Sequence, residues 1–389
     1  MTALTACLLA VAATGLGLYA TAWLVTVRWS RAGSRRTPAA DLTGVTILKP
    51  LCGFDEDLEA NLRSFFLLAH EPLQLVFGAA DAGDPALDVV RRLARRYPNR
   101  DVAIVLGGDS DAASPKVGLL ESLLPHARHD LILLSDSNVR VAADEIGRVL
   151  PCFADPRVGM VYQPVVGIGE CTLPAAIENL HYTEFAGLLS IGAAIVAGQH
   201  AVNAKGQWVR RRALDDAGGF ADVRDHGADD FVLSRLVAEA GGKLRLAPVP
   251  VRIVHRAWSW CGLVQRHLRH SGLRRRICPW AYPLELVLNP VPWTLPLLAT
   301  DYALCVPAVA ALKILLEVSA ARLLRAQALA PRHVAAILLK DAVYFVGWFA
   351  SFAVRTVTWR GRTYAIGPGG RLDPVEPLPE TALAARPAA

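Results

Sequence analysis

The chain has 389 residues, of which 53% are apolar and only 20% are charged, and its mean hydropathy is +0.32. This composition is more apolar than that of ordinary soluble proteins, so part of the chain is expected to lie in lipid. The net charge is +6, and basic residues crowd positions 28–36 and 266–276. Both basic runs flank apolar segments, and no RNA- or DNA-binding signature accompanies them. The expected partner of this charge is therefore an anionic membrane surface and not nucleic acid.

The first expected element is a membrane anchor over residues 1–28. Residues 3–27 carry no charged side chain and are long enough to cross a hydrocarbon core of about 30 Å. By the positive-inside rule, the arginines that follow predict an outer N-terminus and a cytosolic continuation. These arginines are Arg28, Arg31, Arg35 and Arg36. A cleaved signal peptide is the competing interpretation, but its basic residues would precede the apolar run.

The seven cysteines are scattered along the chain without any C-x-x-C pair. Their spacing argues against a zinc site and against a disulfide framework. A reducing, cytosolic compartment is the expected setting.

Residues 41–255 alternate short apolar runs with amphipathic stretches, which is typical of an α/β domain. Strands are expected at residues 45–49, 73–77, 131–134, 158–163 and 249–254. Helices are expected at 55–66, 84–97, 142–152, 174–190, 208–217 and 230–240. No internal repeat is visible, so this region is predicted to be one domain of the size that binds a nucleotide.

Two acids follow expected buried strands of this domain. Asp81 comes after the apolar run at 73–77, and Asp136 comes directly after the run at 131–134. Ligands of open α/β sheets bind outside the carboxyl ends of the strands. We therefore expect both carboxylates to face a binding crevice.

The second of these acids suggests a metal site. Asp136, with Asn138 two residues later, offers the hard oxygen ligands that Mg²⁺ or Mn²⁺ takes together with phosphate oxygens. Such a cation neutralises the charge that develops on a leaving diphosphate. The attacking alcohol also needs a base, and Asp230, beside Asp229 at the start of an expected helix, is the candidate. Repulsion between these neighbouring carboxylates tends to raise the proton affinity of one of them.

Residues 256–281 are predicted to form an amphipathic helix in the headgroup plane, because Leu263, Arg266, Arg269 and Leu273 recur at helical spacing. Arg266 and Arg269 lie one turn apart and could clamp a diphosphate with their planar guanidinium groups.

Residues 282–360 contain three further apolar stretches, 284–300, 302–316 and 334–354, interrupted by prolines. If the basic run 355–362 is cytosolic, an even number of crossings must follow the domain, and one stretch is then re-entrant or interfacial. Two crossings between 299 and 354 would instead place Arg322, Arg325 and Arg332 outside, against the charge rule. The number of crossings stays open at this point. Residues 361–389 are expected to be a disordered tail.

Each motif taken alone has a structural alternative. Asp81 and Asp136 could simply form turns, and Asp229 and Asp230 could complement a helix dipole. Arg266 and Arg269 could be a solvated or lipid-facing stripe. The functional interpretation depends on the conjunction of these motifs, in this order, between membrane segments.

In that order the motifs resemble those of the ceramide glucosyltransferases, and much of the pattern is shared with hopanoid glycosyltransferases. The resemblance is carried by 47–53 (ILKPLCG), 81–86 (DAGDPA), 114–117 (SPKV), 136–141 (DSNVRV), 228–231 (ADDF) and 359–362 (WRGR). It implies a GT-A type, Rossmann-like nucleotide-sugar domain with N-terminal and C-terminal transmembrane helices. It further implies a cytosolic active site in a multi-pass membrane enzyme that transfers glucose from UDP-glucose, with Mg²⁺ or Mn²⁺, to the primary hydroxyl of a ceramide-like lipid with inversion.

The resemblance also implies roles for single residues. Asp81 would hold the uracil or ribose, Asp136 the metal and diphosphate, and Asp230 would be the catalytic base. Lys116 and Asp229 would bind substrate, and residues 266–270 would form the last family motif, with Arg266, Arg269 and His270 in contact with substrate.

Two positions depart from the family pattern. His270 stands where tryptophan is expected, and imidazole offers a smaller stacking face and can carry a proton near neutrality. Residues 202–208 (VNAKGQW) replace a smaller, more apolar run. Two alternatives therefore remain at this point, an N-acetylglucosaminyltransferase acting on hopanoid lipids and a catalytically degenerate membrane protein that binds UDP. A processive polysaccharide synthase is disfavoured because few membrane spans remain to build a channel.

Overall fold

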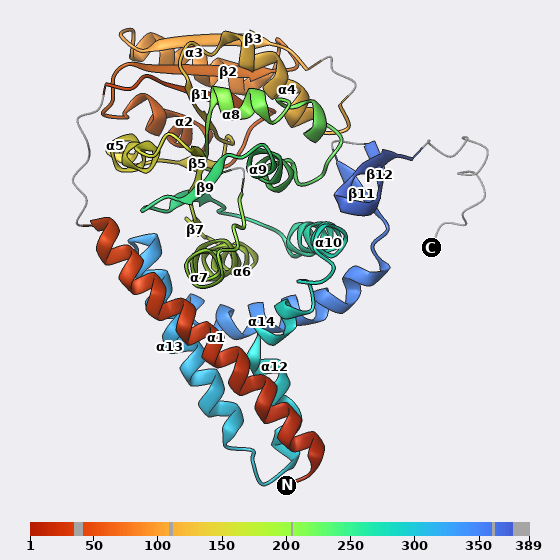
Figure 1. Ribbon diagram of the computed structural model, residues 1–389. Helices are drawn as coiled ribbons and strands as arrows, with labels where there is room; N and C mark the ends of the chain where they lie inside the picture. Colours follow the sequence, from red (N-terminus) through yellow and green to blue (C-terminus); the bar gives the residue numbers. More distant parts are fainter. Residues whose placement is uncertain (35–41, 109–111, 204, 360–361, 376–389) are drawn as a thin grey trace.

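The computed structural model describes residues 1–34, 42–108, 112–203, 205–359 and 362–375, and a seven-stranded sheet lies at its centre (Figure 1). The strand order is β3-β2-β1-β4-β8-β6-β9. In that order the strands span Asp101–Leu106, Leu73–Ala79, Val45–Pro50, Leu131–Leu134, Gln207–Arg210, Val158–Tyr162 and Lys243–Leu246. Strands β3, β2, β1 and β4 run parallel, whereas β8 is antiparallel to both of its neighbours. The predicted α/β fold class is confirmed.

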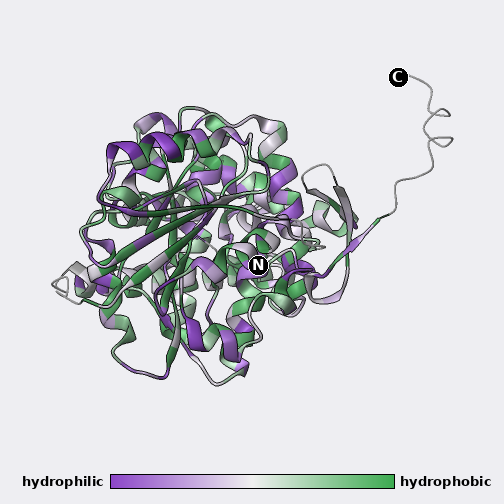
Figure 2. Cartoon of the chain, turned by 90° about the horizontal axis from the view of Figure 1, so that it is seen from above, coloured by the Kyte–Doolittle hydropathy of each residue, from purple (hydrophilic) through white to green (hydrophobic). Residues whose placement is uncertain are grey.

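Helices cover both faces of this sheet, because successive side chains of a strand point to opposite faces. Ile47, Leu75 and Leu133 pack on one face against α2 (Leu58–Phe66), α3 (Pro85–Arg96) and α5 (Glu145–Val149). Their chain neighbours on the same three strands pack on the other face against α4 (Pro115–Leu123), α8 (Arg211–Asp216) and α9 (Asp229–Glu239). From above, the strands are hydrophobic and the outer helices carry most of the hydrophilic residues (Figure 2).

Two small sheets complete the domain. β10 (Val251–Val254) pairs with β5 (Val139–Arg140) and β7 (Val165–Ile168). The third sheet consists of β11 (Thr356–Trp359), β12 (Arg362–Ile366) and β13 (Leu372–Pro374), and it joins the domain where the Leu372 N–H donates to the Asp225 carbonyl at 2.7 Å. The expectation of a disordered tail from residue 361 therefore does not hold for residues 362–374. The remaining part of that tail, 376–389, lies outside the described residues.

The helix predicted at 208–217 is wrong in its first part. Gln207–Arg210 form strand β8, in which Trp208 pairs with Leu133 on one side and Val161 on the other. The aromatic and β-branched residues of this segment are buried in the sheet core, and only Arg211–Asp216 continue as a helix.

Three helical segments extend away from the sheet side by side (Figure 1). They are α1 (Ala3–Ser34), the broken segment made of α11 (Leu284–Val287), α12 (Pro290–Thr294) and the 3₁₀ helix η5 (Leu295–Ala299), and α13 (Cys305–Arg325). Packing is close enough that a Cβ on Gly15 of α1 would overlap the Val287 carbonyl oxygen. The second and third segments form a hairpin that leaves the domain and returns to it.

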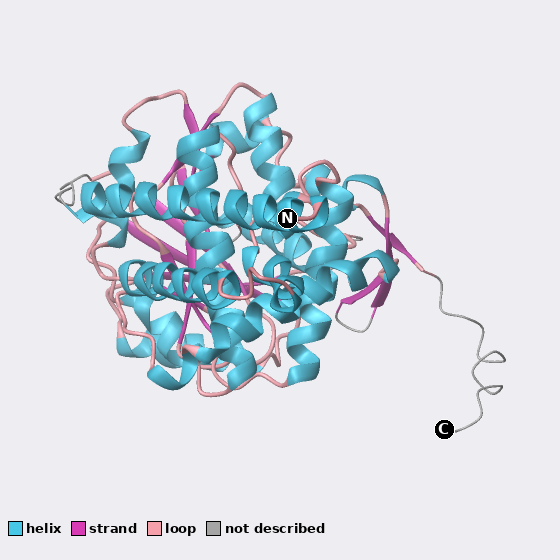
Figure 3. Cartoon of the chain, turned by 90° about the horizontal axis from the view of Figure 1, so that it is seen from below, coloured by secondary structure: helices cyan, strands magenta, loops and turns pink. Residues whose placement is uncertain are grey.

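A further layer of helices lies crosswise beneath the sheet, as the views in Figures 1 and 3 agree. It contains α6 (Leu173–His181), the π-helix η3 (Tyr182–Leu189), α7 (Ser190–Ala197), α10 (Trp260–Ile277) and α14 (Ala335–Ala350). Three helical segments, residues 3–33, 173–197 and 331–353, are apolar and long enough to cross a membrane by composition alone. Only the first of them extends away from the domain, because the other two belong to the crosswise layer.

This arrangement removes the conflict over the basic residues near 322–332. Arg325 Nη2 donates to both carboxylate oxygens of Glu170, at 2.6 and 2.7 Å, and Glu170 lies just beyond β7 of the domain. The end of α13 and its arginines therefore lie on the domain side. Arg35 and Arg36, which also entered the charge argument, lie outside the described residues.

Candidate active site

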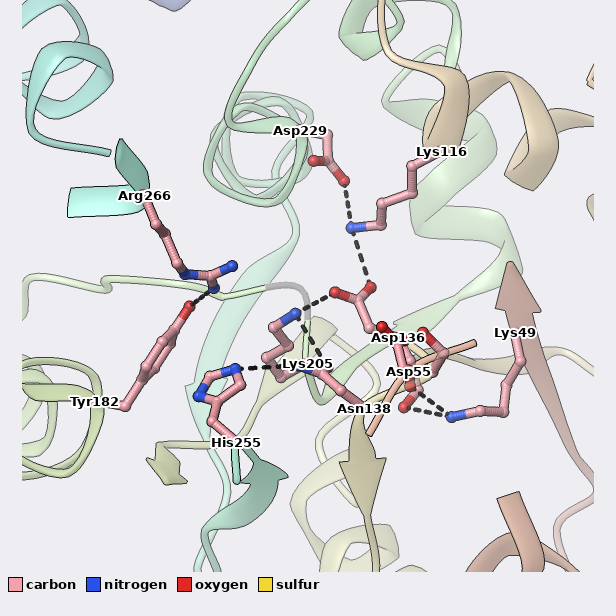
Figure 4. Close-up of polar contacts among 12 residues, drawn as sticks. Lys49, Asp55, Lys116, Asp136, Asn138, Tyr182, Lys205, Asp229, His255 and Arg266 are labelled. Atoms are coloured by element: carbon pink, nitrogen blue, oxygen red, sulfur yellow. Dashed lines mark hydrogen bonds and ion pairs between the residues drawn. The ribbon is translucent and has the colours of Figure 1, made fainter. Parts of the chain in front are cut away.

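The predicted metal ligand Asp136 lies at the carboxyl edge of the sheet, just past β4. Its carboxylate contacts two lysines that come from distant parts of the chain (Figure 4). Lys116 Nζ lies 3.4 Å from Oδ1, and Lys205 Nζ donates to Oδ2. Burial alone would raise the pKa of Asp136, but the Lys116 and Lys205 ammonium groups outweigh it and hold that pKa below its ordinary value.

A third amine supports the backbone of the same residue. Lys49, at the end of β1, is fully buried, and its Nζ donates to the Asp136 carbonyl at 2.7 Å and to Ser135 Oγ at 3.2 Å. The amine also lies 3.5 Å from the centre of the Phe65 ring. Burial lowers the pKa of Lys49 well below its ordinary value. Lys49 thus fixes the turn that carries Asp136.

Lys116 links two of the predicted acid motifs. It sits in the first turn of α4, and its Nζ donates to Asp229 Oδ2 at 2.8 Å while also facing Asp136. Burial would lower the pKa of Lys116, but Asp136 and Asp229 together raise it above its ordinary value. The sequence motifs at 116, 136 and 229 therefore meet in one place.

A chain of hydrogen bonds fixes how Asn138 points. Asn179 Nδ2 donates to the carbonyls of Ile168 and His255 and to the Glu170 carboxylate. This fixes the orientation of the amide, so Asn179 Oδ1 accepts from His255 Nδ1 at 3.1 Å. The bare His255 Nε2 then accepts from Asn138 Nδ2 at 3.4 Å.

Asn138 Oδ1 is left to face the Lys205 ammonium group, also at 3.4 Å. Burial and the nearby Arg266 lower the pKa of His255 well below its ordinary value, which keeps the imidazole neutral in this role.

The space between Asp136 and Asn138 suits a divalent cation. A carboxylate and an amide oxygen point toward one spot, and the side chain that meets them, Lys205, is itself cationic. Two such ligands together with phosphate oxygens are the set that Mg²⁺ or Mn²⁺ commonly takes. The residues therefore fit the predicted metal, provided that Lys205 moves aside.

Three carboxylates elsewhere also lie close together, namely Glu184, Glu317 and Asp341. They belong to η3, α13 and α14, and Lys313 and Lys340 lie between them. Their charge is thus already compensated by lysines, and this cluster is separate from the predicted metal ligand Asp136.

The predicted base, Asp230, opens α9 next to Asp229. Its Oδ1 accepts the N–H of Phe231 at 2.8 Å, and its carbonyl accepts from Gln207 Nε2 at 3.1 Å. Asp230 is near enough to Lys116 to contribute to the raised pKa of that lysine. The acid pair thus borders the same pocket as Asp136.

Asp81 occupies the same edge of the sheet without joining the cluster. It follows β2, which is two strands from β4, so about 10 Å of sheet separates it from Asp136. Asp81 is exposed, and its Oδ1 accepts the N–H of Gly83 at 2.8 Å in a turn. This position suits contact with an outlying part of a ligand, and the role of Asp81 stays a prediction.

The two arginines of α10 have different surroundings. Arg266 Nε donates to Glu178 Oε1 at 2.9 Å, its Nη2 donates to the Tyr182 hydroxyl, and it lies over the Tyr182 and Trp258 rings. Arg269 has no carboxylate within ion-pair distance among the described residues. Arg269 is thus the more available of the two for an anionic ligand.

His270 follows them on the same helix. Burial, together with Arg266 and Arg269, lowers the pKa of His270 well below its ordinary value. Burial and the four neighbouring cations Arg266, Arg269, Arg274 and Lys205 thus oppose a proton on this imidazole near neutrality.

Several residues of the site were missed by sequence reasoning. Lys49 gave a usable signal, since an amine inside an otherwise apolar strand must find oxygen partners at the strand end. Lys205 lay within a stretch noted only as unusual. His255, directly after β10, followed the same strand-end rule that identified Asp136 and could have been found by it.

Comparison with known proteins gives a match to glycosyl transferase family 21 over residues 5–372. Ceramide glucosyltransferase 3 of Caenorhabditis elegans is 25% identical over 245 residues, 62% of this chain and 52% of that protein. Ceramide glucosyltransferase 1 of the same species is 27% identical over 215 residues, 55% of this chain and 46% of that protein. The chain thus spans about half the length of these curated relatives.

Solved structures give a weaker likeness. The mannosyltransferase PcManGT of Pyrobaculum calidifontis, in complex with GDP-Man and Mn²⁺, is 18% identical. The match covers 88% of this chain and 98% of that one, with a TM-score of 0.48.

Proposed function

The chain belongs to glycosyl transferase family 21, and from this premise we propose that it transfers glucose from UDP-glucose to the primary hydroxyl of a ceramide-like lipid, with inversion. That it is a glycosyltransferase of the GT-A type, as its sequence predicts, follows from family membership and the parallel-rich α/β sheet. The donor, the acceptor and the stereochemistry are proposals, supported by the names of the curated relatives and by the site.

One observation carries the proposal, namely the convergence of Lys116, Asp136 and Asp229 from three separate sequence motifs. These motifs are 20 and 93 residues apart along the chain (136 − 116 and 229 − 136), and only the fold brings them together. Amines and carboxylates held at one sheet edge are the groups that a diphosphate and its cation require.

In the proposed reaction, Asp136 and Asn138 would hold the divalent cation, which would supply positive charge against the leaving diphosphate. Lys116, Lys205 and Arg269 face the same anion with ammonium and guanidinium groups. Asp230 accepts the proton of the acceptor hydroxyl. The oxygen of that hydroxyl attacks the anomeric carbon of the sugar, and the bond between the sugar and the diphosphate breaks. A single base and no second carboxylate nucleophile correspond to one displacement, and therefore to inversion.

We also propose a membrane arrangement for this reaction. α1 and the hairpin formed by residues 284–325 would cross the bilayer, and the helices of the crosswise layer would lie at its cytosolic surface. Exposed apolar side chains on these elements support contact with lipid, including Leu18 on α1, Leu315 on α13 and Phe349 on α14. The active site would then face the cytosol, next to the leaflet that carries the acceptor.

The test is transfer by purified protein from UDP-glucose to a short-chain ceramide, measured as labelled glycolipid. Asp230→Asn is expected to bind UDP like the parent and to lose transfer by a factor of 10² to 10⁴, which is roughly the contribution of a general base. Asp222→Asn, an acid on the neighbouring 3₁₀ turn, is the matched control and should keep activity.

Unchanged turnover in Asp230→Asn would remove Asp230 from the role of base. A product that retains the α configuration of the donor would rule out a single displacement. Absence of transfer to ceramide, with transfer from UDP-N-acetylglucosamine to a hopanoid lipid instead, would replace the proposed donor and acceptor.

A further inference from the structure

A cavity lies on the membrane side of α10, about a quarter turn around that helix from Arg266. It is enclosed by η3, α10, the 284–294 segment and α14, and it measures about 560 Å³ including its mouth. One part of its wall is apolar, with Phe185, Leu286, Phe345 and Trp348. The other part is polar, and its groups include His181, Glu184, His267, Arg274, Asn289 and Asp341. A wall divided in this way suits an amphiphilic molecule.

The polar wall has a surplus of hydrogen-bond acceptors. Asp341 is only 3% exposed, and its Oδ2 has no hydrogen-bond partner among the described residues. The same is true of Asn289 Oδ1, whose amide is held in place because Nδ2 donates to the Asp341 carbonyl at 2.8 Å. Buried acceptors without a donor are costly, so a ligand that brings N–H or O–H groups would be stabilised there.

The cations of this wall are already engaged. Arg274 binds Glu285 through two nitrogens, at 2.8 and 3.1 Å, and Lys340 contacts Glu184 and Glu317. Phosphate is a poor match for such a wall, because it brings negative charge beside the Asp341 carboxylate, whose Oδ2 has no hydrogen-bond partner among the described residues, while the charge of Arg274 is already compensated by Glu285. The wall therefore selects a neutral, donor-bearing head over a phospholipid head.

Two connections join this cavity to the catalytic side. Tyr344 lines the cavity and donates to Glu178 Oε2 at 2.9 Å, while the other oxygen of Glu178 accepts from Arg266. The π-helix η3 supplies both Glu184 to the cavity and Tyr182 to Arg266. π-helical turns are rare and occur frequently at functional sites. A ligand in the cavity would thus touch Tyr344, which holds the Glu178 partner of Arg266, and would reach Arg266 through these two side chains.

We propose that this cavity binds the polar head of the acceptor lipid through its amide N–H and the hydroxyl groups other than the primary hydroxyl that reacts, with the aliphatic chains leaving along the apolar wall. The inference rests on the proposed function, which it deepens by assigning an acceptor subsite and the head chemistry that the subsite takes. Exposed Leu284 and Val346, on the elements that border the cavity, supply apolar surface for the chains.

The experiment measures binding of a fluorescent short-chain N-acyl amino-alcohol lipid to the full chain in detergent, without donor, by fluorescence anisotropy. Asn289→Leu removes one acceptor and is expected to raise the Kd about tenfold, the loss of one or two hydrogen bonds. Phe345→Trp narrows the apolar wall without removing a polar group and is expected to weaken binding as well. Thr294→Val, buried on the same segment but outside the cavity wall, is the matched control and should bind like the parent.

Competing lipids test the selectivity of the head site. The unlabelled parent lipid should displace the probe, whereas its N-methyl, O-methyl derivative and phosphatidic acid should not. Equal displacement by phosphatidic acid, or parent-like binding by both Asn289→Leu and Phe345→Trp, would overturn the proposal. UDP binding serves as the check that each variant is folded.

The failure of this site and the failure of the proposed function can be told apart. If the variants weaken lipid binding as expected but UDP-glucose gives no glycolipid, the transferase proposal fails and the lipid site stands. If glycolipid forms and Asn289→Leu and Phe345→Trp leave the KM for acceptor unchanged, the lipid site fails and the transferase proposal stands.

Discussion

Two clusters of lysines and carboxylates in this molecule differ in composition and in access. The catalytic cluster has three lysines and two carboxylates, which are Lys49, Lys116, Lys205, Asp136 and Asp229. The membrane-side cluster has two lysines and three carboxylates, which are Lys313, Lys340, Glu184, Glu317 and Asp341. Asp230 borders the first cluster and makes its lysines and carboxylates equal in number, whereas carboxylates are in excess in the second.

Access to solvent divides the two clusters further. The side chains of Asp136 and Lys205 are 22% and 14% exposed, whereas those of Lys313 and Glu317 are 0% and 3% exposed. Two members depart from this division, because Lys49 is fully buried and Glu184 is 11% exposed. Charges that reach solvent can exchange one partner for another, because water compensates them during the exchange. Buried charges cannot exchange partners in this way, because the loss of one partner leaves the other charge uncompensated. The open cluster is thus suited to exchanging one ion-pair partner for another, and the closed one to holding helices together beside the cavity that Asp341 lines.

The largest expected effect follows from breaking the closed cluster. Lys313→Met leaves Glu184 and Glu317 with one ammonium group fewer, in surroundings where Glu317 is only 3% exposed. We expect the free energy of unfolding to fall by about 3 to 5 kcal/mol, the usual cost of removing one partner of a buried ion pair. The measurement is denaturant unfolding of the purified protein in detergent.

The matching change in the open cluster gives the comparison. Lys205→Met should lower the free energy of unfolding by less than about 1 kcal/mol, because its partners remain in contact with water and with Lys116. The double variant Lys313→Met with Glu317→Gln should recover part of the loss. Equal loss of stability in the two single variants would contradict the distinction between an open and a closed cluster.

The sequence located the open cluster better than the closed one. Short apolar runs before Asp136 and Asp81 predicted strand ends, and strand ends in a parallel sheet share one edge. Lys205 was beyond such reasoning, because its contact with Asp136 depends on the antiparallel pairing of β8 with β4 across some seventy residues. The same pairing defeated the helix predicted from residue 208.

Hydropathy left the number of membrane crossings open for a physical reason. α14 has the composition of a crossing helix yet lies crosswise, while α13 runs beside α1 although Lys313 and Glu317 lower its apolar content. Composition averages over a whole segment, so it cannot register that a lysine and a glutamate compensate each other across helices. The pairing of Lys313 with Glu184, 129 residues away, is visible only in the fold.

A buried carboxylate without any lysine shows what the ammonium groups contribute in both clusters. Glu145 is 4% exposed, forms no ion pair within the described part of the chain, and accepts from the Ala142 N–H and from Gln163 Nε2, each at 2.8 Å. Burial raises the pKa of Glu145 to about 7, against 4.5 in the unfolded chain. Between these two pH values the carboxyl group of Glu145 is therefore protonated in the folded state and ionised in the unfolded state.

The contribution of Glu145 to the free energy of unfolding is therefore largest below about pH 4.5, and it falls as the pH rises to about 7. The change amounts to about 3 kcal/mol, from the size of the pKa difference. Glu145→Gln should remove this slope, so that unfolding measured at pH 5 and pH 8 differs less in the variant than in the parent. An unchanged slope would show that Glu145 is ionised when folded.

Arg266 stands between the two clusters, and its geometry is expected to matter more than its charge. A lysine at this position keeps one positive charge but cannot reach both Glu178 and Tyr182 as the planar guanidinium does. Arg266→Lys should lower kcat/KM roughly 30-fold, about 2 kcal/mol. Arg275→Lys is the control and should keep its activity. Arg275 lies on the same helix, and its Nη2 donates to the Val354 backbone carbonyl. Retained activity in Arg266→Lys would reduce the role of Arg266 to charge alone.

The smallest expected effect tests whether the open cluster exchanges partners. Lys205 stands where the predicted cation would bind, between Asp136 and Asn138, so cation and ammonium compete for the same oxygens. In the absence of the sugar nucleotide, Lys205→Met should therefore raise the affinity of the protein for Mn²⁺ by about tenfold, or 1.4 kcal/mol. The measurement is electron paramagnetic resonance of free Mn²⁺. The same variant should bind UDP more weakly without metal, because one ammonium group that faces the diphosphate is gone. The affinity for Mn²⁺ should thus rise while the affinity for UDP falls. A general loss of structure would weaken both affinities. Opposite changes therefore indicate that the Lys205 ammonium group binds Asp136 in the free protein and the diphosphate in the complex. Weaker Mn²⁺ binding in Lys205→Met would instead make Lys205 a fixed part of the site, and the open cluster would then be as rigid as the closed one.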